Sequence, residues 1–345
     1  RHFNTSSFYS SLSVSIVLAG ITLGSIPSGF LSEKYSILPL AALASVLIII
    51  CDIGCALTIN LGTLISLRFC QGLFIPFLTS AMAASLTRSV ADQNIVRGIA
   101  WYVTATILGG MTGRLMGGVT HYLATWQFAF LYSAAMLALS CLIASALLPN
   151  RFSQKKVYSN IGSYRKIILE KKLWGSFVCA FVGQGIFSAV FNTLPYRLDS
   201  EPYNLSSNFI SFIYGVYILG IFVAPVTGRL TIRYGSDRTL TGGAFVLFVS
   251  LLILTGDRMF DVIIGLSGIC IGFFAIHTTA AARLNRRMIK DHGQANSLYM
   301  VFYYLGAFWG SSWSIVVFKA ASWNSVLFIA AGLVLILFKV SSKPG

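Results

Sequence analysis

The sequence predicts an all-α membrane protein whose helices cross the bilayer eleven times. Composition is the first reason: 56% of the 345 residues are hydrophobic, 10% are charged, and the mean hydropathy is +0.78. A water-soluble surface needs far more charge than this. The second reason is that apolar runs of roughly 17–25 residues, long enough to span a bilayer, recur along the whole chain. The third is an uneven distribution of Lys and Arg between alternate loops.

The eleven candidate spans differ in how polar they are. Eight contain no Asp, Glu, Lys or Arg, and the other three carry Asp52, Arg68 and Arg114. In order, the spans cover about residues 9–32, 37–57, 62–86, 98–120, 125–149, 173–194, 206–228, 239–256, 262–282, 294–318 and 320–338.

The net charge of +15 indicates topology rather than nucleic-acid binding. When the loops are assigned alternately to two sides, one side holds only Arg1, Arg197, Arg258 and Lys319. Arg68 and Arg114 lie within spans, so 19 of the 25 Lys and Arg fall on the other side. The positive-inside rule places that side in the cytoplasm. It includes a basic segment, 150–172, which we interpret as a cytoplasmic linker, either solvated or partly helical on anionic lipid.

Related motifs in the two halves indicate a duplication, with an N-terminal half at 1–149 and a C-terminal half at 173–345. The pairs lie 199, 200 and 197 residues apart: 29–36 with 228–235, 72–74 with 272–274, and 109–113 with 306–310. Two spans precede Gly228 in its half, but only one precedes Gly29. The sequence therefore predicts that a first helix is missing ahead of Arg1.

Two six-helix halves, a basic central loop and these motifs resemble the major facilitator superfamily of secondary transporters. The resemblance covers the whole chain and implies the major facilitator fold, with helix 1 missing. It also implies alternating access to a site at the middle of the membrane. The sequence contains no Walker-type loop, so ATP drive is not expected. The six cysteines are too dispersed for a metal site, and neither a cofactor nor an enzymatic activity is expected.

The repeated loop motif is similar to the family's Gly-xxx-Asp-Arg-x-Gly signature. The first copy has Gly29, Glu33 and Lys34, and the second has Gly228, Arg233 and Gly235. Ser36 and Ile232 depart from the pattern. The resemblance implies a cytoplasmic latch between conformations, while a simple surface turn is the alternative.

Arg68 lies within an apolar run, where a charge costs about 2.5–3.5 kcal/mol on insertion scales. With Gln71 it is similar to a family motif whose Arg is associated with proton coupling. The structural alternative is an Arg that only braces helices. Asp52 and Arg68 are each eight residues from residue 60, the centre of a predicted helical hairpin. They should therefore lie at similar depth and could form a neutralising pair, unless Asp52 lies near the membrane interface.

Gly109, Gly113 and Gly117 recur every four residues, a pattern typical of close helix packing. With Arg114 they resemble a motif of drug:proton antiporters, except that Arg114 replaces its Pro. The counterparts in the second half are Gly306 and Gly310.

Three further groups are candidate pathway residues. Gln184, Ser188 and Asn192 share one helix face and line a cavity or bond between helices. His277 handles protons or is a hydrogen-bonded packing residue. Tyr299 and Tyr303 stack on an organic substrate or on other aromatic side chains.

Together these features predict a multi-pass secondary active transporter of the bacterial inner membrane. The expected activity is proton-coupled export of a small organic solute by a monomer surrounded by lipid, with no nucleic-acid or metal partner. One alternative is proton symport or facilitated uptake of a small solute. Another is a membrane receptor or scaffold that does not transport.

Overall fold

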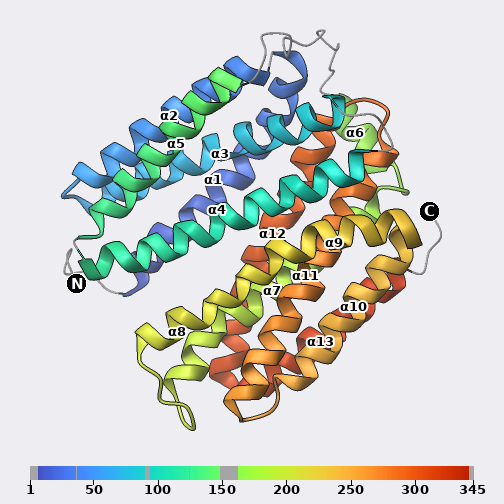
Figure 1. Cartoon of the computed structure of the whole chain (residues 1–345). Helices are drawn as coiled ribbons and strands as arrows, with labels where there is room; N and C mark the ends of the chain where they lie inside the picture. Colours follow the sequence, from blue (N-terminus) through green and yellow to red (C-terminus); the bar gives the residue numbers. More distant parts are fainter. Residues whose placement is uncertain (1–6, 36, 90–93, 124, 148–161, 342–345) are drawn as a thin grey trace. The chain divides into compact units, whose positions relative to one another are not determined.

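The computed structural model describes residues 7–35, 37–89, 94–123, 125–147 and 162–341, and these form helices joined by short loops (Figure 1). The elements of the first part of the chain are α1 (Ser7–Lys34), α2 (Ile37–Leu57), α3 (Leu61–Ser89), α4 (Ile95–Leu123), α5 (Gln127–Leu147) and α6 (Gly162–Leu169). They are followed by α7 (Trp174–Asp199), α8 (Ser207–Ile213), η3 (Tyr214–Tyr217), α9 (Ile218–Tyr234), α10 (Ser236–Ile253), α11 (Met259–Arg287), α12 (His292–Ala320) and α13 (Trp323–Ser341).

Within the described residues, nine helical stretches are long and apolar enough to cross a membrane. They correspond to nine of the eleven predicted spans. The other two predicted spans, 9–32 and 98–120, fall in α1 and α4. Of these two helices, α1 contributes a shorter apolar stretch, Ile16–Ser32. The prediction of a helical multi-pass membrane protein is confirmed.

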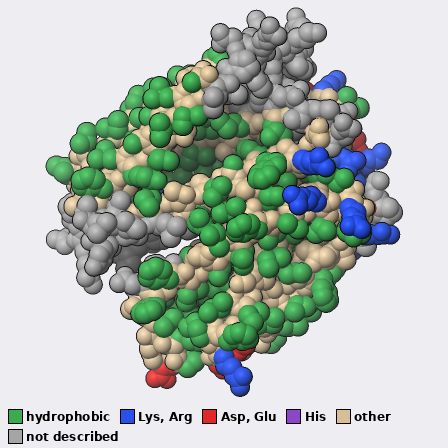
Figure 2. Space-filling view, in the orientation of Figure 1, with side chains coloured by type: hydrophobic (Ala, Val, Ile, Leu, Met, Phe, Trp, Pro, Cys, Tyr) green, Lys and Arg blue, Asp and Glu red, His purple; other side chains and the backbone are tan. Residues whose placement is uncertain are grey.

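The surface of the helices is apolar where a soluble protein would be polar. Phe212 is 80% exposed, Leu57 75% and Leu142 67%. Figure 2 shows hydrophobic side chains over much of the face in view, with Lys and Arg gathered in a patch at its right-hand side. Soluble monomers rarely expose apolar patches larger than a few hundred Å². In a bilayer the same side chains face lipid tails, so their exposure costs nothing.

The chain divides into two compact units whose borders run through helices. Unit 1 comprises residues 1–89, 112–167 and 288–301, and unit 2 comprises residues 90–111, 168–287 and 302–345. Both α4 and α12 are therefore shared between the units. In unit 1, α3 packs against α1 and α2, and α2 packs against α5. In unit 2, α11 packs against α7, α9 and α10, and α13 packs against α7 and α10.

Helix α7 is largely buried in unit 2 because it carries no charged residue before Arg197. Its surface is mostly apolar apart from a few polar side chains such as Gln184, Ser188 and Asn192, and a helix of this composition can be buried on most sides. Two glycines of α12 allow a close approach. A Cβ at Gly306 would overlap the backbone of Phe181, and one at Gly310 the backbone of Gly185. Close contact of α7 and α12 depends on these small residues.

Candidate functional site

Three polar side chains of unit 1 form one hydrogen-bonded chain between α2 and α3. The amide Nε2 of Gln71 donates to Oδ1 of Asp52 over 2.6 Å. Arg68 donates from NH1 to Oε1 of Gln71 over 2.9 Å. Gln71 therefore bridges the acid and the base that the hairpin geometry placed at similar depth.

This chain is shielded from solvent. Asp52 and Gln71 are each 3% exposed, and the guanidinium carbon of Arg68 lies 5.4 Å from the centroid of the Phe130 ring on α5. Oδ2 of Asp52 is buried and makes no hydrogen bond of normal geometry with the described residues, although the Ser133 side chain on α5 is close enough to interact with the carboxyl group. A buried carboxylate is costly unless polar or charged groups compensate it, and here Gln71 and, through Gln71, Arg68 do so.

The polar stripe of α7 makes contacts both along the helix and across it. Nε2 of Gln184 donates to Oγ of Ser188 over 3.2 Å. Nδ2 of Asn192 donates to Oγ of Ser311 on α12. Oε1 of Gln184 is buried and accepts no hydrogen bond from the described residues. One end of the stripe thus joins two helices, while the other retains an unused acceptor.

His277 of α11 lies in an aromatic cluster of unit 2. Its ring stacks on Phe273, with centroids 5.9 Å apart and an interplanar angle of 15°. The ring of Tyr303 on α12 is 5.0 Å from that of His277. Phe273 in turn stacks on Phe187 of α7, with 4.2 Å between centroids. Sequence reasoning singled out His277 and Tyr303 but missed the phenylalanines, because Phe is common throughout the apolar spans.

Tyr299 has a different environment from Tyr303, although the two are one helical turn apart on α12. Tyr299 belongs to the part of α12 in unit 1 and is 1% exposed. Tyr303 belongs to unit 2 and contacts His277 and Tyr304.

The first copy of the loop motif is closely packed at its glycine. A Cβ at Gly29 would lie 2.6 Å from Cβ of Ser297 and 2.6 Å from the hydroxyl of Tyr164. The Tyr164 hydroxyl donates to the backbone oxygen of Ile26 and lies 3.1 Å from Oγ of Ser297. Lys34 Nζ lies 5.6 Å from the Tyr35 ring centroid, and the side chain of Glu33 lies outside the described residues.

The second copy has the same close packing at Gly228, where a Cβ would lie 2.8 Å from Cβ of Ala100 on α4. Gly235 ends α9 and precedes α10 with a φ of +86°, a conformation that side chains disfavour. The guanidinium carbon of Arg233 lies 5.2 Å from the Tyr234 ring centroid.

An ion pair near this second copy was not anticipated. NH1 of Arg283 on α11 lies 3.0 Å from Oδ1 of Asp237 on α10. The second motif copy has Ile232 where an acid is usual. Asp237, the sole acidic residue between Glu201 and Asp257, supplies a carboxylate five residues later. The isolation of Asp237 among uncharged and basic residues was the sequence signal that could have identified this ion pair.

Two glycines of α4, Gly109 and Gly113, make no close contact at the Cβ position with other described residues. A Cβ at Gly109 or Gly113 would meet no described atom within 4 Å. The structure does not describe the side chain of Arg114 or the surroundings of Gly117. Close packing is found instead at the counterparts in α12, Gly306 and Gly310.

Comparison with known proteins decides the family. The family model for the Major Facilitator Superfamily matches residues 1–201 and 177–341. The chain belongs to the Major Facilitator Superfamily. The expected major facilitator fold is thereby confirmed, while the absence of a first helix stays a prediction. This superfamily consists of transporters rather than enzymes.

Three relatives are similar to this superfamily member along most of its length. The uncharacterized MFS-type transporter YybF of Bacillus subtilis is 28% identical over 319 residues, which cover 89% of this chain and 77% of the relative. The inner membrane transport protein YnfM of Escherichia coli is 26% identical over 320 residues, covering 89% and 75%. The multidrug transporter MdfA of Yersinia pestis is 22% identical over 269 residues, covering 75% and 64%.

The fold is also similar to solved structures of the superfamily. The crystal structure of the human organic anion transporter MFSD10 superposes with a TM-score of 0.82 at 14% identity, covering 97% of this chain and 82% of that one. The protein is therefore a multi-pass secondary transporter of the inner membrane.

Proposed function

We propose that this transporter couples the export of a small organic solute to the inward movement of protons. The observation that carries the proposal is the hydrogen-bonded series Asp52–Gln71–Arg68, which joins an acidic and a basic side chain within two candidate membrane spans. Ionisable groups within a membrane are rare, costly and concentrated on proton and substrate pathways.

The chemistry of the three side chains Asp52, Gln71 and Arg68 suits a proton carrier. With Asp52 ionised, its negative charge offsets Arg68 through the Gln71 amide, and the three groups together are neutral. When Asp52 takes a proton, its negative charge is lost and the net charge of the three groups becomes +1 in an apolar surrounding. Protonation therefore changes the electrostatic free energy of unit 1 by the full effect of one buried charge, which is a means of favouring one conformation over another.

The aromatic cluster of unit 2 is the proposed contact for the solute. Phe187, Phe273, His277 and Tyr303 offer flat rings, and Gln184 offers a buried carbonyl oxygen. Binding sites for small organic molecules are mostly apolar and aromatic, with a few polar groups that orient the ligand. The names of two similar proteins, a multidrug transporter and an organic anion transporter, support an organic substrate.

Alternating access would come from the two predicted halves, 1–149 and 173–345, acting as a monomer. The glycines at 29 and 228 would serve as the close contacts of the cytoplasmic latch. Tyr299, Gly306 and Gly310 would hold α12 in place while Tyr303 faces the solute.

Proteoliposomes that contain the purified protein and the trapped pH indicator pyranine would test the coupling. A panel of organic cations and anions is added under an imposed pH gradient, and solute-dependent proton flux is recorded. We expect Asp52→Asn and Arg68→Ala to reduce that flux at least tenfold while the protein still inserts. Ser140→Ala, an exposed hydroxyl on α5, is the control.

The sign of the flux separates the alternatives. Protons moving against the solute indicate export, and protons moving with it indicate symport. Solute movement without proton flux indicates facilitated uptake. If Asp52→Asn keeps the full solute-dependent proton flux, Asp52 is not the proton carrier. If the wild type shows no solute flux, a receptor or scaffold is favoured.

A further inference from the structure

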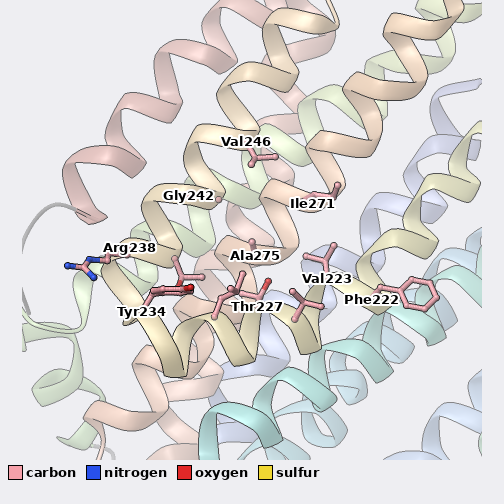
Figure 3. A pocket seen from close by; sticks show the side chains of 13 residues that line it. Phe222, Val223, Thr227, Tyr234, Arg238, Gly242, Val246, Ile271 and Ala275 are labelled. Carbon is pink, nitrogen blue, oxygen red and sulfur yellow. The ribbon is translucent and has the colours of Figure 1, made fainter.

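An open groove of about 500 Å³ lies along unit 2 between α9, α10 and α11. Figure 3 shows side chains of all three helices directed toward it. Its walls are mainly aliphatic, with Val223 and Val226 from α9, Val246 from α10 and Ile271 from α11. Gly242 leaves space in it, because a Cβ at that position would meet no described atom within 4 Å.

The groove lies in the part of unit 2 that is expected to cross the membrane. Its lining residues lie within three candidate spans, Tyr214–Tyr234, Ser236–Ile253 and Met259–Arg287. Phe222 at one end is 65% exposed and Val226 is 50% exposed. Water is not expected to be held in this groove, because a bound water needs about two to four polar hydrogen-bond partners and the walls offer few. Within a bilayer, the molecule available to fill such an apolar groove on the surface of unit 2 is an acyl chain.

One end of the groove is cationic. Arg238 lines the groove where α9 turns into α10, and Figure 3 shows its guanidinium beyond the aliphatic side chains. Tyr234 also lines this end, and the Arg233 guanidinium carbon lies 5.2 Å from its ring centroid. Both arginines are on the side that the positive-inside rule places in the cytoplasm.

The neighbouring acid does not cancel this charge. Oδ1 of Asp237 lies 3.0 Å from NH1 of Arg283, so its negative charge is already balanced. Arginine binds phosphate through a planar fork of donors. An apolar groove within the membrane, with Arg238 lining its cytoplasmic end and Arg233 beside the Tyr234 ring, matches the two parts of an anionic phospholipid.

We infer that this groove binds one anionic phospholipid of the cytoplasmic leaflet. One acyl chain lies in the groove against α9, α10 and α11, and the phosphate group is held by Arg238 and Arg233. A second helix packed in the same groove is the competing occupant. A partner helix in that position would have to bring an acid to the arginines, whereas an anionic lipid carries its charge at the required depth.

Native mass spectrometry of the full chain would test the lipid site. The detergent-purified protein is mixed with equal amounts of phosphatidylglycerol and phosphatidylcholine, and the lipid retained after activation is counted. We expect the wild type to retain phosphatidylglycerol preferentially. The double variant Arg233→Ala/Arg238→Ala should retain at least fivefold less phosphatidylglycerol than the wild type. The control is Arg165→Ala, an exposed arginine of α6 outside the groove.

A second pair of variants tests the groove itself without changing charge. Gly242→Leu should reduce retained phosphatidylglycerol at least threefold, because the new side chain occupies the space of the acyl chain. Gly332→Leu on α13 is the matched control, since a Cβ there also meets no described atom within 4 Å and the residue does not line the groove. Melting temperatures of both variants report whether the fold is kept, and Gly242→Val replaces the leucine variant if it unfolds.

Several results would overturn the inference. Equal retention of the two lipids would exclude selection by the arginines. Unchanged retention in either the arginine double variant or the groove-filling variant would exclude the site. A wild-type dimer that Gly242→Leu converts to monomer would show that a helix of a second copy, rather than a lipid, occupies the groove.

Discussion

Gly228 of α9 packs against Ala100 of α4 so closely that a Cβ at residue 228 would lie 2.8 Å from the Ala100 Cβ. The same contact exists in the other motif copy, where Gly29 of α1 packs against Ser297 of α12. The two glycines are 199 residues apart and their partners 197. Each motif glycine thus packs against a helix of the other predicted half. Gly29 of the first half contacts the second half, and Gly228 of the second half contacts the first. This correspondence supports an internal duplication from contacts as well as from motif spacing.

Gly228→Leu should weaken the contact between α9 and α4. The added side chain has no space beside Ala100, and overpacking typically costs about 1–3 kcal/mol. We expect a lower melting temperature and at least a tenfold loss of transport in proteoliposomes. Gly215→Leu is the control because a Cβ at Gly215 meets no described atom within 4 Å. Normal transport by Gly228→Leu would show that the contact is not part of the latch.

Gln71→Leu should destabilise unit 1 more than its small change in volume suggests. Without the amide, Oδ1 of Asp52 and NH1 of Arg68 both lose a hydrogen bond. Leaving a buried polar group unsatisfied costs about 1–3 kcal/mol. Thermal unfolding in detergent measures the loss. Gln71→Glu, which retains an acceptor for Arg68, distinguishes the two bonds, and an unchanged melting temperature for Gln71→Leu would contradict the bridging role.

The sequence predicted the depth of Asp52 and Arg68 but not the residue that joins them. Depth follows from counting residues along a hairpin, whereas the bridge depends on how the Gln71 side chain is turned by α2 and α3. The glycine motifs show the same division. Spacing alone could not tell that Gly306 packs tightly on α7 while a Cβ at Gly109 would meet no described atom within 4 Å, because the sequence does not name the opposing helix.

The Arg283–Asp237 pair and the aromatic cluster around Phe273 mark a second limit. Asp237 and Arg283 are separated by two helical segments, and their approach depends on the packing of α10 against α11. Phe187 and Phe273 have no distinguishing sequence context, so only the tertiary structure brings them to His277.

Tyr164 should make stability fall at alkaline pH. Burial raises the pKa of its phenol above the ordinary 10.0, while hydrogen bonds with Ser297 and the backbone of Phe30 lower it. The folded protein therefore retains this proton above pH 10.0, where the unfolded chain loses it. The contribution to stability is complete below that pH and is lost as pH rises through the folded pKa.

A titration of melting temperature from pH 8 to 11 would check this dependence. Tyr164→Phe should flatten the alkaline decline, although it lowers stability at pH 8 because the hydrogen bonds to Ile26 and Ser297 are lost. Tyr35→Phe, at a tyrosine that is 54% exposed, should leave the profile unchanged. An identical decline in wild type and Tyr164→Phe would assign the effect to other groups.

The hydrogen bond from Asn192 to Ser311 allows the two interpretations of the α7 stripe to be separated. If the bond joins α7 and α12, Asn192→Ala and Ser311→Ala should be non-additive in unfolding free energy. Side-chain bonds between membrane helices average about 0.6 kcal/mol in double-mutant cycles, so a coupling of that size is expected. Transport should then fall in proportion to the loss of folded protein.

The pathway interpretation gives a different pattern. If Asn192 contacts the solute, Asn192→Ala should raise the solute KM in proteoliposomes while Ser311→Ala leaves it near the wild-type value. Ser312→Ala is the control for the serine, because Ser312 is the neighbouring exposed residue and bonds only within α12 among the described contacts. A coupling near zero together with a KM change confined to Asn192→Ala would assign Asn192 to the solute pathway.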